Sequence, residues 1–215
     1  MESENKSKRK RLLLFGLTGL ALVGGGVASW WYTQVWDVKK NPLSPVGGLY
    51  FPWEVNITVP LFSQADEAWK MDRMGPSQGN LGAEGCAVTS VAMLFAYYGI
   101  DVDPKRLNQF LSDWNGYTEQ GWLYWEAAAA YTQGRVEHVY EDLPSYRLMD
   151  ANLIRGNPVV VRVRPFGGRT THFVLVTGKK GCEYFVNDPG GGGRRVPLSS
   201  FGSPVEALRF YEKKN

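Results

Sequence analysis

The sequence contains little cysteine and little histidine, with two of each in 215 residues. Two cysteines exclude a disulfide-rich scaffold, and the spacing of two cysteines and two histidines disfavours a structural zinc finger. Hydrophobic and aromatic residues, in contrast, make up 44% and 13% of the chain. This composition supplies a packed core and excludes a chain that is disordered throughout.

An excess of one charge is also missing from most of the chain. Lys and Arg number 24 against 21 Asp and Glu, which gives a net charge of +3. Residues 1–11 hold five basic and two acidic residues, so they carry the whole excess and the remainder is neutral. We therefore expect no nucleic-acid partner, because binding one requires clustered Lys and Arg on the folded domain.

Charged residues are absent from residues 12–36, a run of 25 residues. About 20 apolar residues span a bilayer, and the basic block before the run favours a cytoplasmic N-terminus. The pattern predicts a basic cytoplasmic tail over residues 1–11 and a single-pass transmembrane helix over residues 12–36. Four aromatic residues near the end of the run suit an interfacial belt: Trp30, Trp31, Tyr32 and Trp36.

A cleaved secretory signal is the alternative interpretation of the same run. Residues 12–23 would be its apolar region, and Gly26-Val27-Ala28 has the small residues of a cleavage site. Under either interpretation, residues 37–215 lie across a membrane. We thus expect a domain outside the cytoplasm, anchored to the cytoplasmic membrane or secreted.

The rest of the chain reads as a linker followed by one domain. Residues 37–57 contain three prolines and a Gly pair, which favour an extended linker, and residues 58–213 have the size of a single domain. Helical patterns come first and β-branched segments follow, so we predict an α+β fold with an antiparallel sheet. We expect helices over 87–98, 103–112, 122–132 and 144–155, and strands over 135–140, 158–164, 171–177, 183–187, 194–198 and 206–212.

Cys86 is the candidate nucleophile. It lies directly before the apolar helix predicted over residues 87–98. A thiol at a helix N-terminus faces free backbone N–H groups and the positive end of the helix dipole, which favour the reactive thiolate. The alternative is a small buried structural cysteine, since most free cysteines are of that kind.

His172 is the candidate base, and Asp188 is the residue that would orient it. The turn over residues 178–183 joins two predicted strands and places residues near 172 and 188 opposite each other, with side chains close enough to touch. A one-residue shift in register would bring Asn187 there instead of Asp188. His138 has no comparable partner in the sequence, so we expect it to be structural or on the surface.

An acyl-transfer site also needs a hydrogen-bond donor for the oxyanion. Gln64 precedes Cys86 by 22 residues and Gln78 precedes it by eight. Either side chain could donate, together with the backbone N–H of Cys86, and the spacing alone does not choose between the two.

These residues and their neighbours resemble a known family. Gln64-Ala65-Asp66, Gly85-Cys86-Ala87-Val88-Thr89-Ser90, Thr171-His172-Phe173-Val174 and Asn187-Asp188-Pro189 follow in the order seen in bacteriocin-processing (double-glycine leader) cysteine peptidase-like domains. The resemblance covers about residues 58–213. It implies a papain-like fold in which a helical half carries the cysteine and a sheet half carries the histidine and the aspartate.

By this resemblance, Cys86 is the nucleophile, His172 the general base and acid, Asp188 the orienting residue and Gln64 the oxyanion-hole residue. One feature departs from papain-like enzymes, in which the glutamine lies only a few residues before the cysteine. Residues 71–83 look like an insertion between Gln64 and Cys86. The transporter fused to the best-known members is absent from this sequence, so their Gly-Gly substrate is not carried over.

The sequence thus predicts a thiol hydrolase that cleaves a peptide or amide bond, with no metal and no organic cofactor. The expected partners are a peptide or protein substrate and the membrane. A catalytically inactive binding module on the same fold is the alternative function. A disulfide between Cys86 and Cys182 would suit an oxidising compartment, but Cys182 falls in the predicted hairpin turn, far from the proposed active-site end.

Overall fold

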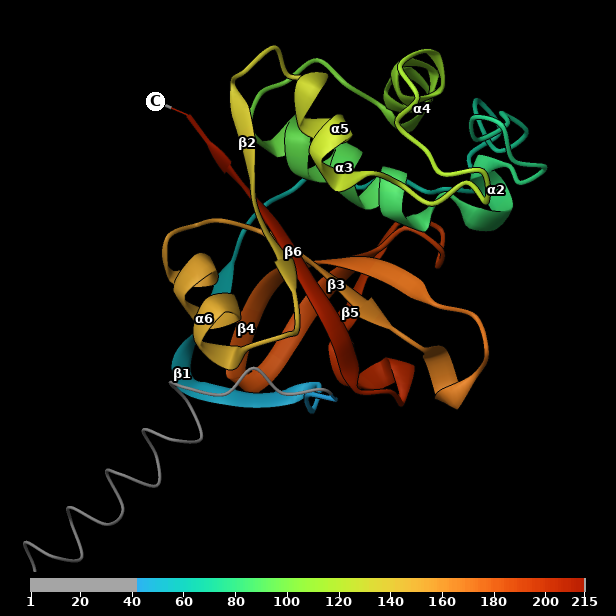
Figure 1. The fold of residues 1–215 in the computed structure, drawn as a ribbon. Coiled ribbons are helices and arrows are strands. Elements are labelled where there is room, and N and C mark those ends of the chain that lie inside the picture. Colours follow the sequence, from blue (N-terminus) through green and yellow to red (C-terminus); the bar gives the residue numbers. More distant parts are fainter. Residues whose placement is uncertain (1–41, 215) are drawn as a thin grey trace, which may run out of the picture. The chain divides into compact units, whose positions relative to one another are not determined.

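The computed structural model describes residues 42–214, which form a single folded unit (Figure 1). The predicted tail, transmembrane helix and first part of the linker lie outside these residues. Among residues 42–214, no helix is long and apolar enough to span a membrane. The described chain is an α+β structure in which every strand pairing is antiparallel, as we predicted.

The sheet contains six strands. The main path runs β1-β4-β3-β6-β2, and β5 pairs with β4 beside this path. The buried apolar runs Val159–Val161 of β3 and Val174–Val176 of β4 explain their central place, because both faces of these segments are covered. The bounds are β1 Val46–Asn56, β2 Val136–Asp142, β3 Val159–Val163, β4 His172–Asp188, β5 Arg194–Pro197 and β6 Val205–Lys213.

Four helices precede the sheet strands β2–β6 and gather on one side of the unit (Figure 1). α6 lies apart from them, against β1 and the sheet. Asp103 caps α4 by accepting a hydrogen bond from the Arg106 backbone N–H at 2.8 Å, as its position before Pro104 predicted. The bounds are α2 Leu81–Glu84, α3 Cys86–Tyr97, α4 Pro104–Asp113, α5 Trp125–Ala130 and α6 Tyr146–Ile154, with 3-10 turns η1 Pro165–Gly167 and η2 Leu198–Phe201.

β4 folds back on itself instead of running straight. A straight strand of 17 residues would separate its ends by about 50 Å, yet the His172 and Asp188 side chains are in contact. The chain reverses near Gly181, whose φ of +59° suits glycine. The predicted hairpin is therefore present, although extended backbone continues through the residues that we expected to form a longer turn.

The second half of the predicted linker is a strand. Residues 46–56 form β1, which pairs with the middle of β4 through two register shifts. The prolines there argue against a helix or a central strand, and β1 is instead a strand at the edge of the sheet. Pro52 is tolerated at an edge because a missing N–H on the outer side breaks no ladder bond.

Buried aromatic side chains join the helical half to the sheet half. Tyr211 of β6 packs against Phe95 of α3 with ring centroids 5.1 Å apart, and its hydroxyl donates to the Trp125 carbonyl at 2.8 Å. Ser90 of α3 donates to the Phe173 carbonyl of β4 at 3.3 Å. These contacts fix α3 against the beginning of β4, which is where the candidate nucleophile and base are located.

Candidate active site

Cys86 is the first residue of α3, and a tight junction with α2 sets its position. Gly85 links the two helices, and a Cβ on Gly85 would lie 2.4 Å from the Leu81 carbonyl oxygen. No larger residue fits there without a shift of the backbone. The Cys86 side chain is buried, and its sulfur lies at the helix end where backbone N–H groups stabilise negative charge.

His172 and Asp188 form a direct pair at the two ends of β4. His172 Nε2 lies 2.7 Å from Asp188 Oδ1, which also accepts from the Gly190 N–H at 2.9 Å. Asn187, the alternative partner, is turned away and accepts a bond from Thr177 Oγ1 at 3.2 Å. Gly190 leaves no space above the pair, since a Cβ there would lie 2.9 Å from His172 Cε1.

The surroundings of His172 favour its protonated form. Burial is the largest single influence and lowers its pKa, but hydrogen bonds with Asp188 and Cys86 and the charges of both residues outweigh burial and raise the pKa to about 9. For Asp188, burial acts first to raise the pKa, and the bonds from His172 and the neighbouring backbone reverse this and lower it. His172 thus bonds directly to Asp188, and Cys86, whose thiol donates to the Glu84 carbonyl at 4.0 Å, lines the same cleft.

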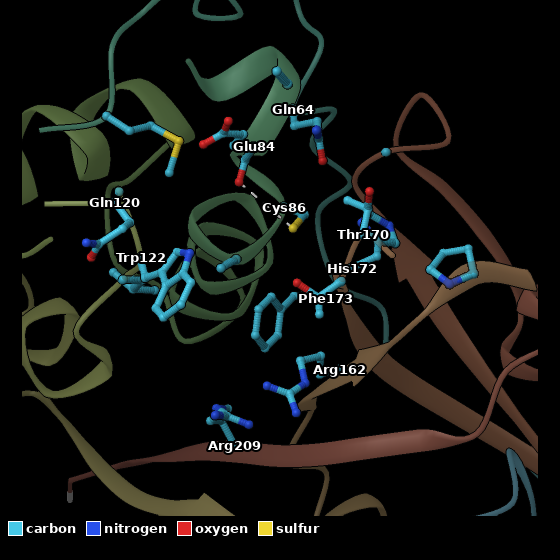
Figure 2. A pocket seen from close by; sticks show the side chains of 18 of the residues that line it. Gln64, Glu84, Cys86, Gln120, Trp122, Arg162, Thr170, His172, Phe173 and Arg209 are labelled. Carbon is cyan, nitrogen blue, oxygen red and sulfur yellow. Dashed lines mark hydrogen bonds between the residues drawn. The ribbon is translucent and has the colours of Figure 1, made fainter. Parts of the chain in front are cut away.

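Of the two glutamines that the sequence offered as oxyanion donors, Gln64 lines this site and Gln78 does not. Gln64 is buried and lines the same cleft as Cys86, His172 and Asp188, whereas Gln78 is exposed and outside it. Its Nε2 donates to the Gly82 carbonyl at 2.9 Å, and its backbone N–H donates to the Pro189 carbonyl at 3.0 Å. Gln64 Oε1 is buried without a hydrogen-bond partner among the described residues, and Figure 2 shows the amide end of Gln64 near Cys86.

A cleft of about 1130 Å³ opens over these four residues. The predicted insertion does not fill it, since only Met74 and Ala83 of residues 71–83 contribute to the wall. Three aromatic side chains of the wall are largely exposed, and backbone strain accompanies one of them, Phe166, which has a φ of +53°. These side chains are Trp122, Tyr124 and Phe166.

The other cysteine and the other histidine lie elsewhere. Cys182 is a free, partly exposed thiol in the turn region of β4, and Cys86 is also free, so the two form no disulfide. His138 of β2 has its Nδ1 3.2 Å from Glu126 Oε2 and packs against the Tyr211 ring. Neither Cys182 nor His138 lines the cleft.

A helical half and an antiparallel sheet half, with cysteine, histidine and aspartate in the cleft, define a papain-like domain. The chain belongs to the Peptidase_C39 like family, whose model matches residues 56–209. The match spans almost all of the described unit and leaves out most of β1. This confirms the resemblance that we drew from the Gly-Cys, Thr-His-Phe-Val and Asn-Asp-Pro motifs.

Solved structures of related proteins also match this chain. A double glycine motif protease from an AMS/PCAT transporter, solved in complex with the leader peptide, has a TM-score of 0.46 and 18% identity; the match covers 74% of this chain and 94% of that one. A putative C39-like peptidase from Bacillus anthracis has a TM-score of 0.47 and 16% identity, with 76% and 100% covered. No curated protein matches.

Our sequence reasoning missed the far part of the cleft. Arg162 of β3 and Arg209 of β6 line it together with Glu141 of β2. A signal was present in the strand pattern, because Arg162 interrupts the otherwise apolar segment Val159–Val163. An arginine in a central strand requires an acidic partner or an opening to solvent.

Proposed function

We propose that this protein is a thiol hydrolase that cleaves a peptide or amide bond with Cys86, His172 and Asp188. The observation that carries the proposal is that the His172–Asp188 pair, with Nε2 2.7 Å from Oδ1, lines one cleft with the Cys86 thiol at the start of α3. A cysteine, a base and an orienting carboxylate in one cleft are the parts that nucleophilic catalysis requires.

The raised pKa of His172, about 9, supports an imidazolium at neutral pH, and in the proposed ion pair this group stands beside the Cys86 thiolate. In the proposed reaction the Cys86 thiolate attacks the carbonyl carbon, and the imidazolium gives its proton to the leaving amine as the carbon–nitrogen bond breaks. Water, deprotonated by His172, then hydrolyses the thioester and releases the acid. Asp188 holds the ring in position and favours its charged form throughout.

The oxyanion of both steps would be stabilised by the backbone N–H of Cys86 and by the Gln64 side chain. Gln64 already uses one Nε2 hydrogen on the Gly82 carbonyl, which leaves the second hydrogen available. The anchoring of Gln64 to Gly82 and Pro189 compensates for the longer separation from Cys86 in the sequence.

The family and the cleft support a peptide substrate. Exposed aromatic side chains around the opening, Trp122, Tyr124 and Phe166, suit apolar side chains of an extended peptide. For the location, the charge-free run over residues 12–36 behind a basic block supports a membrane-tethered enzyme whose domain lies outside the cytoplasm.

The reactivity of Cys86 tests this proposal against an inactive binding module. We expect iodoacetamide to alkylate Cys86 of the folded protein near neutral pH faster than it alkylates a free thiol peptide, because thiolate is the reactive form. We expect Cys86→Ala to abolish cleavage of a peptide library while its melting temperature stays near that of the wild type. Cys182→Ala is the matched control and should keep full activity.

A Cys86 that reacts no faster than the free peptide would contradict the activated nucleophile. Cleavage that persists in Cys86→Ala would contradict the assignment of the nucleophile itself. If the folded wild type binds peptides in the cleft but cleaves none of them, the binding-module alternative is correct.

A further inference from the structure

Two arginines form a cationic pair at the far end of the cleft. Arg162 lies opposite Phe173 in the β3–β4 pairing, and Arg209 lies on the neighbouring strand β6, opposite Val160 of β3. Since Arg162 pairs with Ala207, Arg162 and Arg209 are diagonal neighbours on one face of the sheet, and both line the cleft. Figure 2 shows both on the side of Phe173 away from Cys86.

The pair has hydrogen-bonding capacity that the protein does not use. Arg209 Nε and Nη1 are buried without a hydrogen-bond partner among the described residues, and only Nη2 donates, to Glu141 at 3.1 Å. Arg162 Nε forms an ion pair with Glu206 Oε2 at 3.2 Å, in an orientation that leaves its N–H without a hydrogen-bond acceptor among the described residues. Leaving such donors buried and unpaired costs free energy, which a ligand could recover.

Neighbouring acidic groups do not cancel the positive charge. Glu206 is shared, since it accepts from Arg164 Nε at 2.9 Å and also lies against Arg162. Glu141 is half-exposed and pairs only with Arg209 in this cluster. Three guanidinium groups therefore face two carboxylates, and the cluster keeps an excess of one positive charge.

Aromatic side chains of the cleft pack against Arg209. The guanidinium carbon of Arg209 lies 5.2 Å from the Trp125 ring centre and 5.6 Å from that of Phe173. Phe173 and His172 are consecutive residues of β4, and both line the cleft together with Arg209. A ligand group bound by the pair would thus belong to the same peptide whose backbone passes Cys86.

We propose that Arg162 and Arg209 form a specificity subsite that binds a carboxylate of the peptide substrate. Guanidinium groups match a carboxylate in shape and charge, and two of them on adjacent strands offer several donors to its two oxygens. The carboxylate is that of an Asp or Glu side chain or of the substrate's own C-terminus. This inference rests on the proposed function, because it deepens the description of the same cleft.

Cleavage of a proteome-derived peptide library, read by mass spectrometry, tests the subsite. We expect wild-type protein to enrich Asp and Glu at one fixed position from the cleaved bond, or to cut at a fixed distance from the C-terminus. Amidation of the library C-termini separates the side-chain carboxylate from the C-terminal one, since only cleavage at a fixed distance from the C-terminus disappears. Arg162→Gln and Arg209→Met should each lower the preference by about ten- to a hundredfold, which is the factor that a charge-assisted hydrogen bond contributes to binding.

Binding to the Cys86→Ala protein provides a measurement that does not require catalysis. Peptides that differ only by Glu→Gln, or by a free against an amidated C-terminus, should differ in affinity by about ten- to a hundredfold, and the difference should vanish in Arg162→Gln. Arg155→Met, which removes an exposed arginine outside the cleft, is the control and should keep the preference.

If the wild-type protein cleaves no peptide but the Cys86→Ala protein still prefers the acidic peptides, the proposed hydrolase is wrong and the carboxylate subsite stands. Equal affinity for the acid and amide peptides, in a folded protein that binds both, would overturn the subsite. The same conclusion follows if Arg162→Gln, the more exposed and better tolerated substitution, leaves the cleavage profile unchanged.

Discussion

Two buried acid–base pairs involve the same strand, β4, and they differ in what surrounds them. Lys179 Nζ lies 2.6 Å from Asp150 Oδ1, and both side chains are almost fully buried, at 0% and 1% exposed. His172 Nε2 lies 2.7 Å from Asp188 Oδ1, and these side chains keep 16% and 8% of their surface. The first pair is enclosed by β1 and α6, whereas the second opens onto the cleft.

The enclosed pair has its hydrogen bonds completed within the protein. Lys179 also donates to the Gly47 carbonyl at 2.8 Å, and Asp150 accepts from the Leu49 N–H at 2.7 Å and the Tyr184 hydroxyl at 2.7 Å. Burial, as the main cause, lowers the pKa of Lys179 although Asp150 opposes it. A shifted pKa is therefore present at both pairs, and only access to the cleft and to Cys86 distinguishes a candidate catalytic pair from a structural one.

Removing one partner of the enclosed pair should produce the largest change in stability. We expect Lys179→Met to lower the free energy of unfolding by about 3–5 kcal/mol, because Asp150 is left as an unpaired buried charge. Denaturant titration followed by fluorescence measures the change. Lys214→Met, which removes an exposed pair with Glu137, is the control and should cost less than about 1 kcal/mol.

The double variant Lys179→Met with Asp150→Asn sharpens this prediction. It should recover part of the loss, because the remaining amide carries no charge. A wild-type stability in Lys179→Met would show that the pair does not hold β1 to the unit. Activity per folded molecule should stay close to that of the wild type, since the enclosed pair is outside the cleft.

Removing the carboxylate of the open pair should affect catalysis more than stability. We expect Asp188→Ala to lower kcat/KM on the order of 10²-fold, because His172 loses its orienting partner and the charge that favours imidazolium. The loss of unfolding free energy should be smaller than in Lys179→Met. Asp113→Ala, which removes an exposed carboxylate bound to Gln109, is the control for both measurements. An unchanged kcat/KM would exclude Asp188 as the orienting residue.

The sequence predicted the open pair but not the enclosed one, and the reasons are physical. His172 and Asp188 lie at symmetric distances from a turn, so hairpin pairing brings them together from local information alone. Lys179 meets Asp150 and β1 only through tertiary packing of segments far apart in the chain. The same limitation explains why residues 46–56 read as a linker: an edge strand with a proline has no sequence pattern of its own until β4 is there to pair with it.

The candidate site shows the same contrast between residues with a local sequence pattern and residues that meet only through tertiary packing. Cys86 could be identified from its place before an apolar helix, and the helix positions from capping and periodicity. The choice of Gln64 over Gln78 depended on the path of residues 65–85, which has no simple local signal. Arg162 and Arg209 were missed because their closeness depends on the order of β3 and β6 in the sheet.

The pH dependence of the open pair gives the smallest and most specific test. His172 has a raised pKa of about 9, so the imidazolium that protonates the leaving amine is lost as pH rises through that value. We expect kcat/KM to fall on the alkaline side near pH 9. In Asp188→Asn this limb should move to lower pH, because the amide keeps a hydrogen-bond acceptor but no longer stabilises the charged ring.

The same shifts determine how the pair contributes to stability. The contribution from His172 is complete below its unfolded pKa of about 6.5 and is lost as pH rises through about 9. Because the pKa of Asp188 is lowered in the folded protein, its contribution to the free energy of unfolding is present above its unfolded pKa of about 3.9 and is lost at lower pH. The excess stability of the wild type over Asp188→Asn should therefore be greatest between about pH 4 and 6.5. An excess that instead grew from pH 6.5 to pH 9 would show that His172 is neutral in the folded protein, and the proposed ion pair with Cys86 would then be wrong.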